Sequence, residues 1–205
     1  RGEGIWLIGA DGTRYLDAYN NVASVGHCHP RVVDAVSRQM ATLNTHSRYL
    51  CEIVYTYAER LLATLPRELS KIVFTCTGSE SIDLSLRIAR AVTGGTGFIV
   101  TANAYHGNTL AVTQISPSST SAEPRSPHVF LVPAPDTYRT PSDDVGPIFA
   151  ANVRKAISAM KRKKIRLAGL VADSIFSSDG IYPGEPGFMA EAIANVRKAG
   201  GLFIA

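Results

Sequence analysis

Residues 74–90 read FTCTGSESIDLSLRIAR, a short apolar run followed by a turn of small residues and then a helical pattern. The backbone N–H groups from Gly78 to Glu80 would open this helix, where they lack partners within the helix and the helix dipole favours an anion. Glycine also lets a ligand approach the backbone closely. The stretch therefore suits a phosphate-binding turn, but from these residues alone the commoner interpretation is an ordinary helix start that Ser79 or Ser81 caps and where nothing binds.

Short apolar runs alternate with helical patterns along most of the chain, which is the order of elements in a mostly parallel sheet. Helices are expected from about Ser81 and again in a segment that carries Met189, Ile193 and Val196. The strands are expected at 72–75, 98–101, 129–132, 167–173 and 201–205. The predicted fold class is α/β, with a mostly parallel sheet flanked by helices.

The N-terminal part follows a different pattern. Residues 4–21 alternate apolar and polar side chains around Asp11-Gly12, which favours a hairpin of two strands. Helical spacing begins at Pro30, a residue that suits a first helical turn, and a second helix is predicted to end at Pro66. We therefore expect a small antiparallel piece followed by two helices.

Two later stretches are interpreted as surface. Residues 116–147 hold seven of the eleven prolines, which predicts a long excursion around the strand at 129–132 that carries little core. The basic stretch from Lys161 to Arg166 is interpreted as a solvated helix end and turn, because the helix dipole favours cations there.

The composition is that of a globular protein, with 205 residues, 45% hydrophobic and 19% charged. The net charge of +4 is spread along the chain, so nucleic acid is not expected as a partner. A membrane partner is not expected either, because no apolar run approaches the roughly 20 residues that span a bilayer. The three cysteines lack paired spacing and no leader-like segment is evident, which favours a reducing, cytoplasmic location.

Several motifs in register resemble the class III aminotransferases, enzymes of fold type I that use pyridoxal 5'-phosphate (PLP). Besides TGSESIDLSLRIAR at 77–90, they include residues 1–36, SRYL at 47–50 and NAYHGNT at 103–109. They are most similar to the branch that contains alanine-glyoxylate aminotransferase-like and ethanolamine-phosphate phospho-lyase-like proteins. The resemblance implies a division into two parts: an N-terminal segment of the small domain with its leading helix, and an incomplete PLP-binding large domain. These parts are residues 1–45 and 46–205.

The resemblance also implies contacts residue by residue. Gly78 and Ser79 would donate backbone hydrogen bonds to the PLP phosphate, Tyr105 would stack on the pyridine ring, and His106 would follow near the same face. An aromatic ring in that place would fix the plane of the cofactor and exclude water.

Asn20 and Tyr49 lie in stretches that approach the substrate in the family. They are the predicted substrate-binding residues.

Two positions depart from the family pattern. Asp173 stands where many relatives carry the glutamate of Glu-Pro-Ile-Gln-Gly, so a carboxylate near the cofactor ring is retained but is one methylene shorter. Ser178 stands where some relatives carry a second glutamate. A neutral residue there argues against ornithine or 4-aminobutyrate as the substrate.

In the family, the lysine that carries the cofactor and the aspartate that holds the pyridine nitrogen lie beyond a strand such as GLFIA, residues 201–205. We therefore expect the natural chain to continue, no catalytic residue within this segment, and no turnover by the segment alone.

The implied activity of the full-length protein is transfer of an amino group from an amine or amino acid to a 2-oxo acid by a homodimer. One alternative is a PLP-dependent phospho-lyase acting on a phosphorylated amine, and another is a non-catalytic relic or accessory domain. A hydrolase triad of Ser79, His106 and Asp173 is disfavoured because the G-x-S-x-G elbow is lacking. A metal site at residues 27–29, HCH, is not expected because consecutive side chains diverge.

Overall fold

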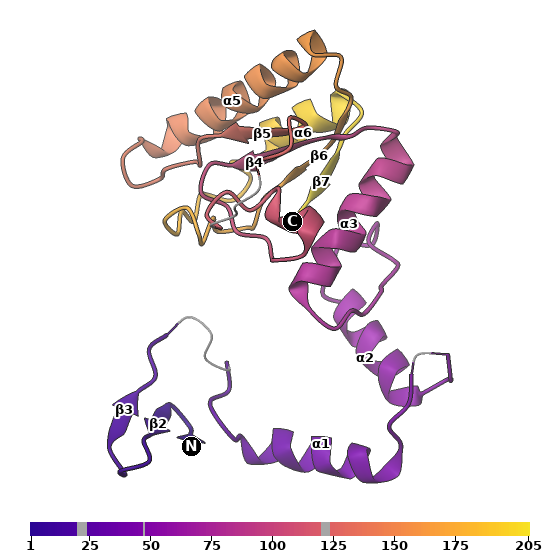
Figure 1. Cartoon of the computed structure of the whole chain (residues 1–205), viewed down its shortest axis with the longest axis vertical. Coiled ribbons are helices and arrows are strands. Elements are labelled where there is room, and N and C mark those ends of the chain that lie inside the picture. The colour runs from indigo at the N-terminus through magenta and orange to yellow at the C-terminus, as the bar shows by residue number, and fades with distance from the viewer. Residues whose placement is uncertain (20–23, 47, 120–123) are drawn as a thin grey trace. The chain divides into compact units, whose positions relative to one another are not determined.

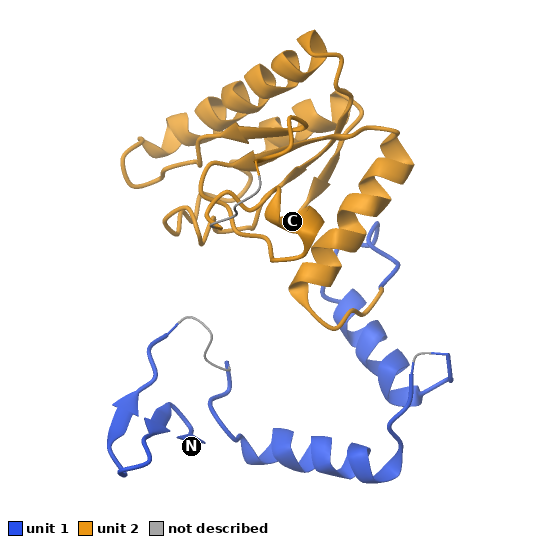
Figure 2. Cartoon of the chain, in the orientation of Figure 1, with its two compact units in different colours: residues 1–72 blue, residues 73–205 orange. Residues whose placement is uncertain are grey.

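The computed structural model describes residues 1–205 apart from 20–23, 47 and 120–123. These residues form two compact units, 1–72 and 73–205, which Figure 2 colours separately. The predicted division between residues 45 and 46 concerns the complete family fold and stays a prediction.

The first unit begins with a three-stranded antiparallel sheet of β1 (Gly2–Glu3), β2 (Trp6–Ile8) and β3 (Arg14–Leu16). Strands β2 and β3 form the predicted hairpin, in which Trp6 pairs with Leu16. The turn is closed by Asp11, whose carboxylate accepts hydrogen bonds from the backbone N–H of Thr13 at 3.0 Å and from its hydroxyl at 2.8 Å. The hairpin is confirmed, and β1 adds a strand that was not predicted.

Two helices complete this unit, α1 (Pro30–Thr42) and α2 (Glu52–Leu62). Pro30 occupies the first turn of α1, as predicted. Helix α2 ends before Pro66, so the prediction that proline ends it is wrong. The hydroxyl of Thr64 donates to the carbonyl of Leu61 at 2.7 Å, and a side chain that bonds the backbone in this way competes with continued helix.

The second unit is built on a four-stranded parallel sheet in the order β5–β4–β6–β7, shown in Figure 1. The prediction of an α/β fold with a mostly parallel sheet is confirmed. The strands are β4 (Gly97–Thr101), β5 (Val129–Val132), β6 (Leu167–Val171) and β7 (Leu202–Ile204).

Helices cover both faces of this sheet (Figure 1). They are α3 (Gly78–Thr93), α4 (Leu110–Thr113), α5 (Ser142–Arg162) and α6 (Ala190–Lys198). Successive strand residues point to opposite faces, so Ile99 and Leu170 pack with α5 and α6, whereas Phe98 and Val171 pack with α3 and α4. Strands buried on both faces read as continuous apolar runs, which is why they were recognisable in the sequence.

The strand predicted at 72–75 is not formed, and the described sheet does not include it. The apolar run IVFT suits a buried strand, but a strand also needs a neighbour that exchanges backbone hydrogen bonds with it. In the described chain, Val73 is exposed. Local sequence alone could not supply that neighbour.

The interpretation of 116–147 as surface with little core is wrong at its C-terminal end. Helix α5 already begins at Ser142, and its first turns bury Val145 and Gly146. A side chain at position 146 would place its Cβ 2.7 Å from the carbonyl oxygen of Phe188, so glycine permits this close packing. Pro147 lies inside the helix, where proline cannot donate a backbone hydrogen bond. The burial of neighbouring side chains offsets the free energy that this missing bond costs.

The basic stretch has the predicted form. Helix α5 ends at Arg162 with Lys161 in its last turn, and Lys164 follows in a left-handed conformation with φ of 57°.

Replacement of Phe149 by alanine tests how strongly the core under α5 supports the second unit. Phe149 is 1% exposed, and its ring meets Phe176 edge-on at 5.8 Å between centroids. We expect Phe149→Ala to lower the free energy of unfolding by about 3–5 kcal/mol, measured by urea unfolding followed by far-UV circular dichroism. Ile148→Ala, at a neighbouring position that is 50% exposed, is the matched control and should change it by less than about 1 kcal/mol. Equal losses in both variants would contradict the assigned core.

Candidate functional site

The start of α3 is capped by Thr77. Its hydroxyl oxygen accepts a hydrogen bond from the N–H of Glu80 at 3.1 Å, and the Glu80 carboxylate accepts one from the N–H of Cys76 at 2.7 Å. Two predictions are therefore wrong. Neither Ser79 nor Ser81 is the cap, and the N–H of Glu80 is not free, because the threonine hydroxyl reaches it first.

Two N–H groups at this helix start remain available, those of Gly78 and Ser79. Among the described residues, neither group donates a hydrogen bond. A Cβ built on Gly78 meets no atom within 4 Å, so open space lies beside the donors. Two unused donors at the positive end of a helix next to open space suit an anionic group.

The loop after β4 is attached to this helix start. The hydroxyl of Ser79 donates to the side-chain oxygen of Asn108 at 2.9 Å and accepts from the Asn108 N–H at 3.1 Å. Gly107, with φ of 136°, permits the contact, because a Cβ there would lie 2.6 Å from the Ser79 hydroxyl oxygen. Thr109 adds a bond by donating to the carboxylate of Asp83 in α3 at 2.7 Å. Residues 103–109 are thus held against α3.

This loop carries the two predicted ring-contacting residues. Tyr105 is 52% exposed, so its ring is available to a ligand. The backbone N–H of His106 donates to the hydroxyl of Ser116 at 3.0 Å, while Nε2 of the His106 ring is buried and has no hydrogen-bond partner among the described residues. A buried nitrogen without a partner is unusual, and it marks a place where a ligand atom would complete the bonding.

The electrostatics at His106 are set by burial and by two carboxylates. Burial is the larger effect and lowers the pKa of His106, while the charges of Asp173 and Asp179 oppose that change by raising it. The ring is therefore held neutral at pH 7, with one nitrogen able to donate and the other to accept.

The carboxylate of Asp173 is used within its own loop. It accepts from the N–H of Ile175 at 2.8 Å, and from the N–H and the hydroxyl of Ser177, both at 3.0 Å. The hydrolase triad is contradicted, because the Ser79 hydroxyl bonds Asn108 and Asp173 bonds its own loop. Whether Asp173 contacts a cofactor ring stays a prediction.

The assignment of Asn20 and Tyr49 to substrate binding stays a prediction. Tyr49 belongs to the first unit and is 64% exposed, with its ring 5.1 Å from that of His46. Asn20 lies outside the described residues. In the first unit, His27 forms a hydrogen bond with the Asp17 carboxylate at 2.7 Å. A separate finding concerns membranes: among the described residues, none of the helices combines the length and the apolar character that a membrane span requires.

Two residues of the site were missed by sequence reasoning. Asn108 lies in the motif NAYHGNT, and its position directly after Gly107 is the signal that could have indicated its role. Asp179 accepts from the hydroxyl of Thr101 at 2.6 Å and from the N–H of Asn103 at 2.9 Å, across 78 and 76 residues of sequence. Nothing local in the sequence indicates such a distant pairing.

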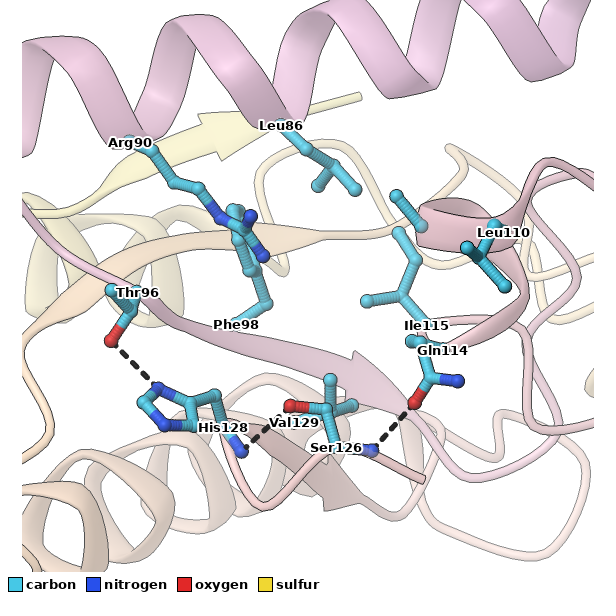
Figure 3. Close-up of a pocket in the computed structure, with 11 residues that line it drawn as sticks. Leu86, Arg90, Thr96, Phe98, Leu110, Gln114, Ile115, Ser126, His128 and Val129 are labelled. Carbon is cyan, nitrogen blue, oxygen red and sulfur yellow. Dashed lines mark hydrogen bonds between the residues drawn. The ribbon is translucent and has the colours of Figure 1, made fainter. Parts of the chain in front are cut away.

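A pocket of about 350 Å³ lies elsewhere on the second unit, against the later turns of α3 (Figure 3). Leu86, Phe98 and Ile115 give it an apolar wall, and the guanidinium of Arg90 lies over the Phe98 ring at 5.5 Å. None of the predicted cofactor-binding residues lines it. The pocket is a gap between packed elements and does not contain the unused N–H donors of α3. The candidate site therefore remains the start of α3 and the loop after β4.

The fold and this site define an α/β domain that presents unused N–H donors beside the loop at the carboxyl end of a parallel strand. The aminotransferase class-III family matches residues 1–205, and the chain belongs to that family.

Three relatives illustrate the similarity. The alanine–glyoxylate aminotransferase 2-like protein of Drosophila melanogaster is 36% identical, over 100% of this chain and 44% of its own length. The ethanolamine-phosphate phospho-lyase homolog 1 of Caenorhabditis elegans is 31% identical, over 97% of this chain and 46% of its own. A solved phospholyase from Arthrobacter in complex with phosphoethanolamine matches with a TM-score of 0.92 and 38% identity, covering 100% of this chain and 49% of its own. The chain thus spans about half the length of these relatives.

An amine transaminase from an uncultivated Pseudomonas species, which shares this fold with a TM-score of 0.84 and 22% identity, is in a PLP-bound form, and the residues of this site fit that cofactor. Two free N–H donors beside open space at Gly78 suit its phosphate. The exposed ring of Tyr105 and the unpartnered Nε2 of His106 suit a flat heteroaromatic ring with polar substituents.

The pKa of His106 predicts how stability depends on pH. An unfolded histidine has a pKa of about 6.5, and the folded value is lower, so the unfolded chain binds more protons between the two values. The free energy of unfolding should therefore fall as pH is lowered from about 7 through that window. Above about pH 7.5 the ring is neutral in both the folded and the unfolded chain, so His106 should not make the free energy of unfolding depend on pH.

Chemical denaturation at a series of pH values measures this effect. His106→Gln should flatten the slope, whereas His46→Gln, at an exposed position in the first unit, should leave it in place. A slope that persists in His106→Gln would show that another group causes it.

Proposed function

We propose that this chain binds the phosphate of PLP at Gly78 and Ser79 and the pyridine ring against Tyr105, and that the full-length protein transfers an amino group from an amine or amino acid to a 2-oxo acid. The observation that carries the proposal is the pair of unused N–H groups at the start of α3, joined to the ring-bearing loop by the two hydrogen bonds between Ser79 and Asn108. A family match over residues 1–205 supports it.

In this proposal the chain binds and orients the cofactor. PLP supplies an electron-accepting ring when it is bound. The N–H groups of Gly78 and Ser79 hold its dianionic phosphate, where the dipole of α3 adds attraction. Tyr105 covers one face of the ring and keeps water from it. His106, neutral at pH 7 because burial lowers its pKa, offers Nε2 as a hydrogen-bonding atom beside the ring.

The remaining parts of the activity are proposed from the family. Asp173 would extend the polar network near the ring, and Ser178 would leave the substrate side without a second carboxylate there. The full-length protein is proposed to be a homodimer with an amino donor and a 2-oxo acid as substrates, and a cytoplasmic location is also a proposal.

A second candidate is a PLP-dependent phospho-lyase that acts on a phosphorylated amine. The observation that favours it is the 38% identity and TM-score of 0.92 to a phospholyase in complex with phosphoethanolamine. The 36% identity to an alanine–glyoxylate aminotransferase 2-like protein keeps amino-group transfer as the first candidate.

Gly78→Val tests the phosphate site without disturbing the fold. A side chain at position 78 meets no protein atom within 4 Å, so it fills the space that the phosphate would occupy. We expect the unchanged chain to bind PLP more tightly than pyridoxal, which lacks the phosphate, and Gly78→Val to lose that difference, as measured by equilibrium dialysis. Ser142→Val, at the first position of α5, is the matched control and should retain it. Equal binding of PLP and pyridoxal by the unchanged chain would contradict the site.

The two candidate activities differ in what they consume and release. Amino-group transfer requires a 2-oxo acid and releases a new amino acid, whereas a lyase needs no oxo acid and converts phosphoethanolamine and water into acetaldehyde, ammonia and phosphate. We expect the full-length protein to depend on a 2-oxo acid and to release no phosphate from phosphoethanolamine. Phosphate release is measured with a colorimetric assay. Release of phosphate in the absence of an oxo acid would establish the second candidate instead.

A further inference from the structure

Asp179 connects two loops that follow neighbouring parallel strands. One carboxylate oxygen accepts from the hydroxyl of Thr101, the last residue of β4, at 2.6 Å, and the other accepts from the N–H of Asn103 at 2.9 Å. Thr101 is 1% exposed, so its hydroxyl needs a partner inside the protein. The two bonds fix the beginning of the loop that carries Tyr105 and His106.

The loop that presents Asp179 is itself rigid. The ring of Phe176 is buried in the core, and its carbonyl oxygen accepts from the N–H groups of Asp179, Gly180 and Ile181 at 3.0, 3.2 and 3.1 Å. Phe176 has φ of 53°, a left-handed conformation that a bulky residue keeps only where its surroundings determine it. The carboxylate is therefore offered from a fixed support.

The same loop after β4 is held at its other end by Asn108 through Ser79. Tyr105 and His106 thus lie between two anchors, one at the helix that would bind the phosphate and one at Asp179. The first anchor ties the end of the loop to the start of α3, and the second ties its beginning to the loop after β6.

We propose that Asp179 is a positioning residue: its carboxylate fixes the loop after β4 so that Tyr105 and His106 face the cofactor ring. This inference rests on the proposed binding of PLP. Asp179 makes no bond to the phosphate-binding groups, so its effect falls on the ring and not on the phosphate.

The test compares two probes, PLP and inorganic phosphate, on the full chain. In Asp179→Ala we expect PLP binding to weaken about tenfold, the effect of losing one well-placed aromatic contact. Phosphate binding should stay within about twofold, because Gly78 and Ser79 are not touched. Induced circular dichroism of bound PLP, which reports a ring held in one orientation, should also be lost. Asp179→Asn keeps an acceptor for the Asn103 N–H and should recover most of both signals.

The matched control is Asp11→Ala in the first unit. The Asp11 carboxylate also accepts one hydrogen bond from a hydroxyl and one from a backbone N–H, both of Thr13, so this variant loses the same two kinds of bond. It should change neither probe. Unchanged PLP binding and dichroism in Asp179→Ala would overturn this inference but not the proposed function. Equal weakening of PLP and phosphate binding would also overturn it, because it indicates a general loss of structure. If the unchanged chain binds neither probe, the proposed function fails and the inference fails with it.

Discussion

The candidate site depends on the two hydrogen bonds between Ser79 and Asn108. They join the start of a helix to a loop 29 residues further along the chain: the Ser79 hydroxyl donates to the side-chain oxygen of Asn108 and accepts from its backbone N–H. The contact is possible only because Gly107 has no side chain at the point of closest approach. Together with the bond from Thr109 to Asp83, it holds the loop that carries Tyr105 against the start of α3, beside the free N–H donors. The donors and this loop therefore lie in one place, where we propose that a phosphorylated ring binds.

The parallel sheet supplies the frame for this contact. Its strands end at a common edge, so the loops after β4 and β6 meet there, and the bonds from Asp179 to Thr101 and Asn103 join them. Both faces of the sheet are covered by apolar side chains, which keeps the strand ends fixed relative to each other. A polar network at a rigid edge is the arrangement that a preorganised binding site requires.

Sequence reasoning predicted the four strands of the parallel sheet and helices α1, α2, α3 and α6, because each has a strong local pattern. It identified the small-residue turn at Gly78 and the helix that follows, while phosphate binding there stays a prediction. It was wrong where a longer-range partner decides the outcome. The run at 72–75 has strand composition but no place in the described sheet, and α5 begins among prolines because Gly146 packs closely on Phe188. The cap at Thr77 was missed because several neighbouring hydroxyls are equally plausible from sequence.

The sequence by itself determined the periodicity of the elements, the small-residue turn before α3 and the membership of a family, since all three are properties of neighbouring residues or of ordered motifs. Only the tertiary structure decided which donors stay free, that Asp173 bonds its own loop, and that Asp179 holds the loop after β4. The physical reason is that hydrogen-bond partners compete over a few tenths of an ångström. For Thr77 and Asp173 the competing partners lie within four residues, where several neighbouring groups are equally plausible, whereas the Asp179 partners lie 78 and 76 residues away, where no local pattern reaches.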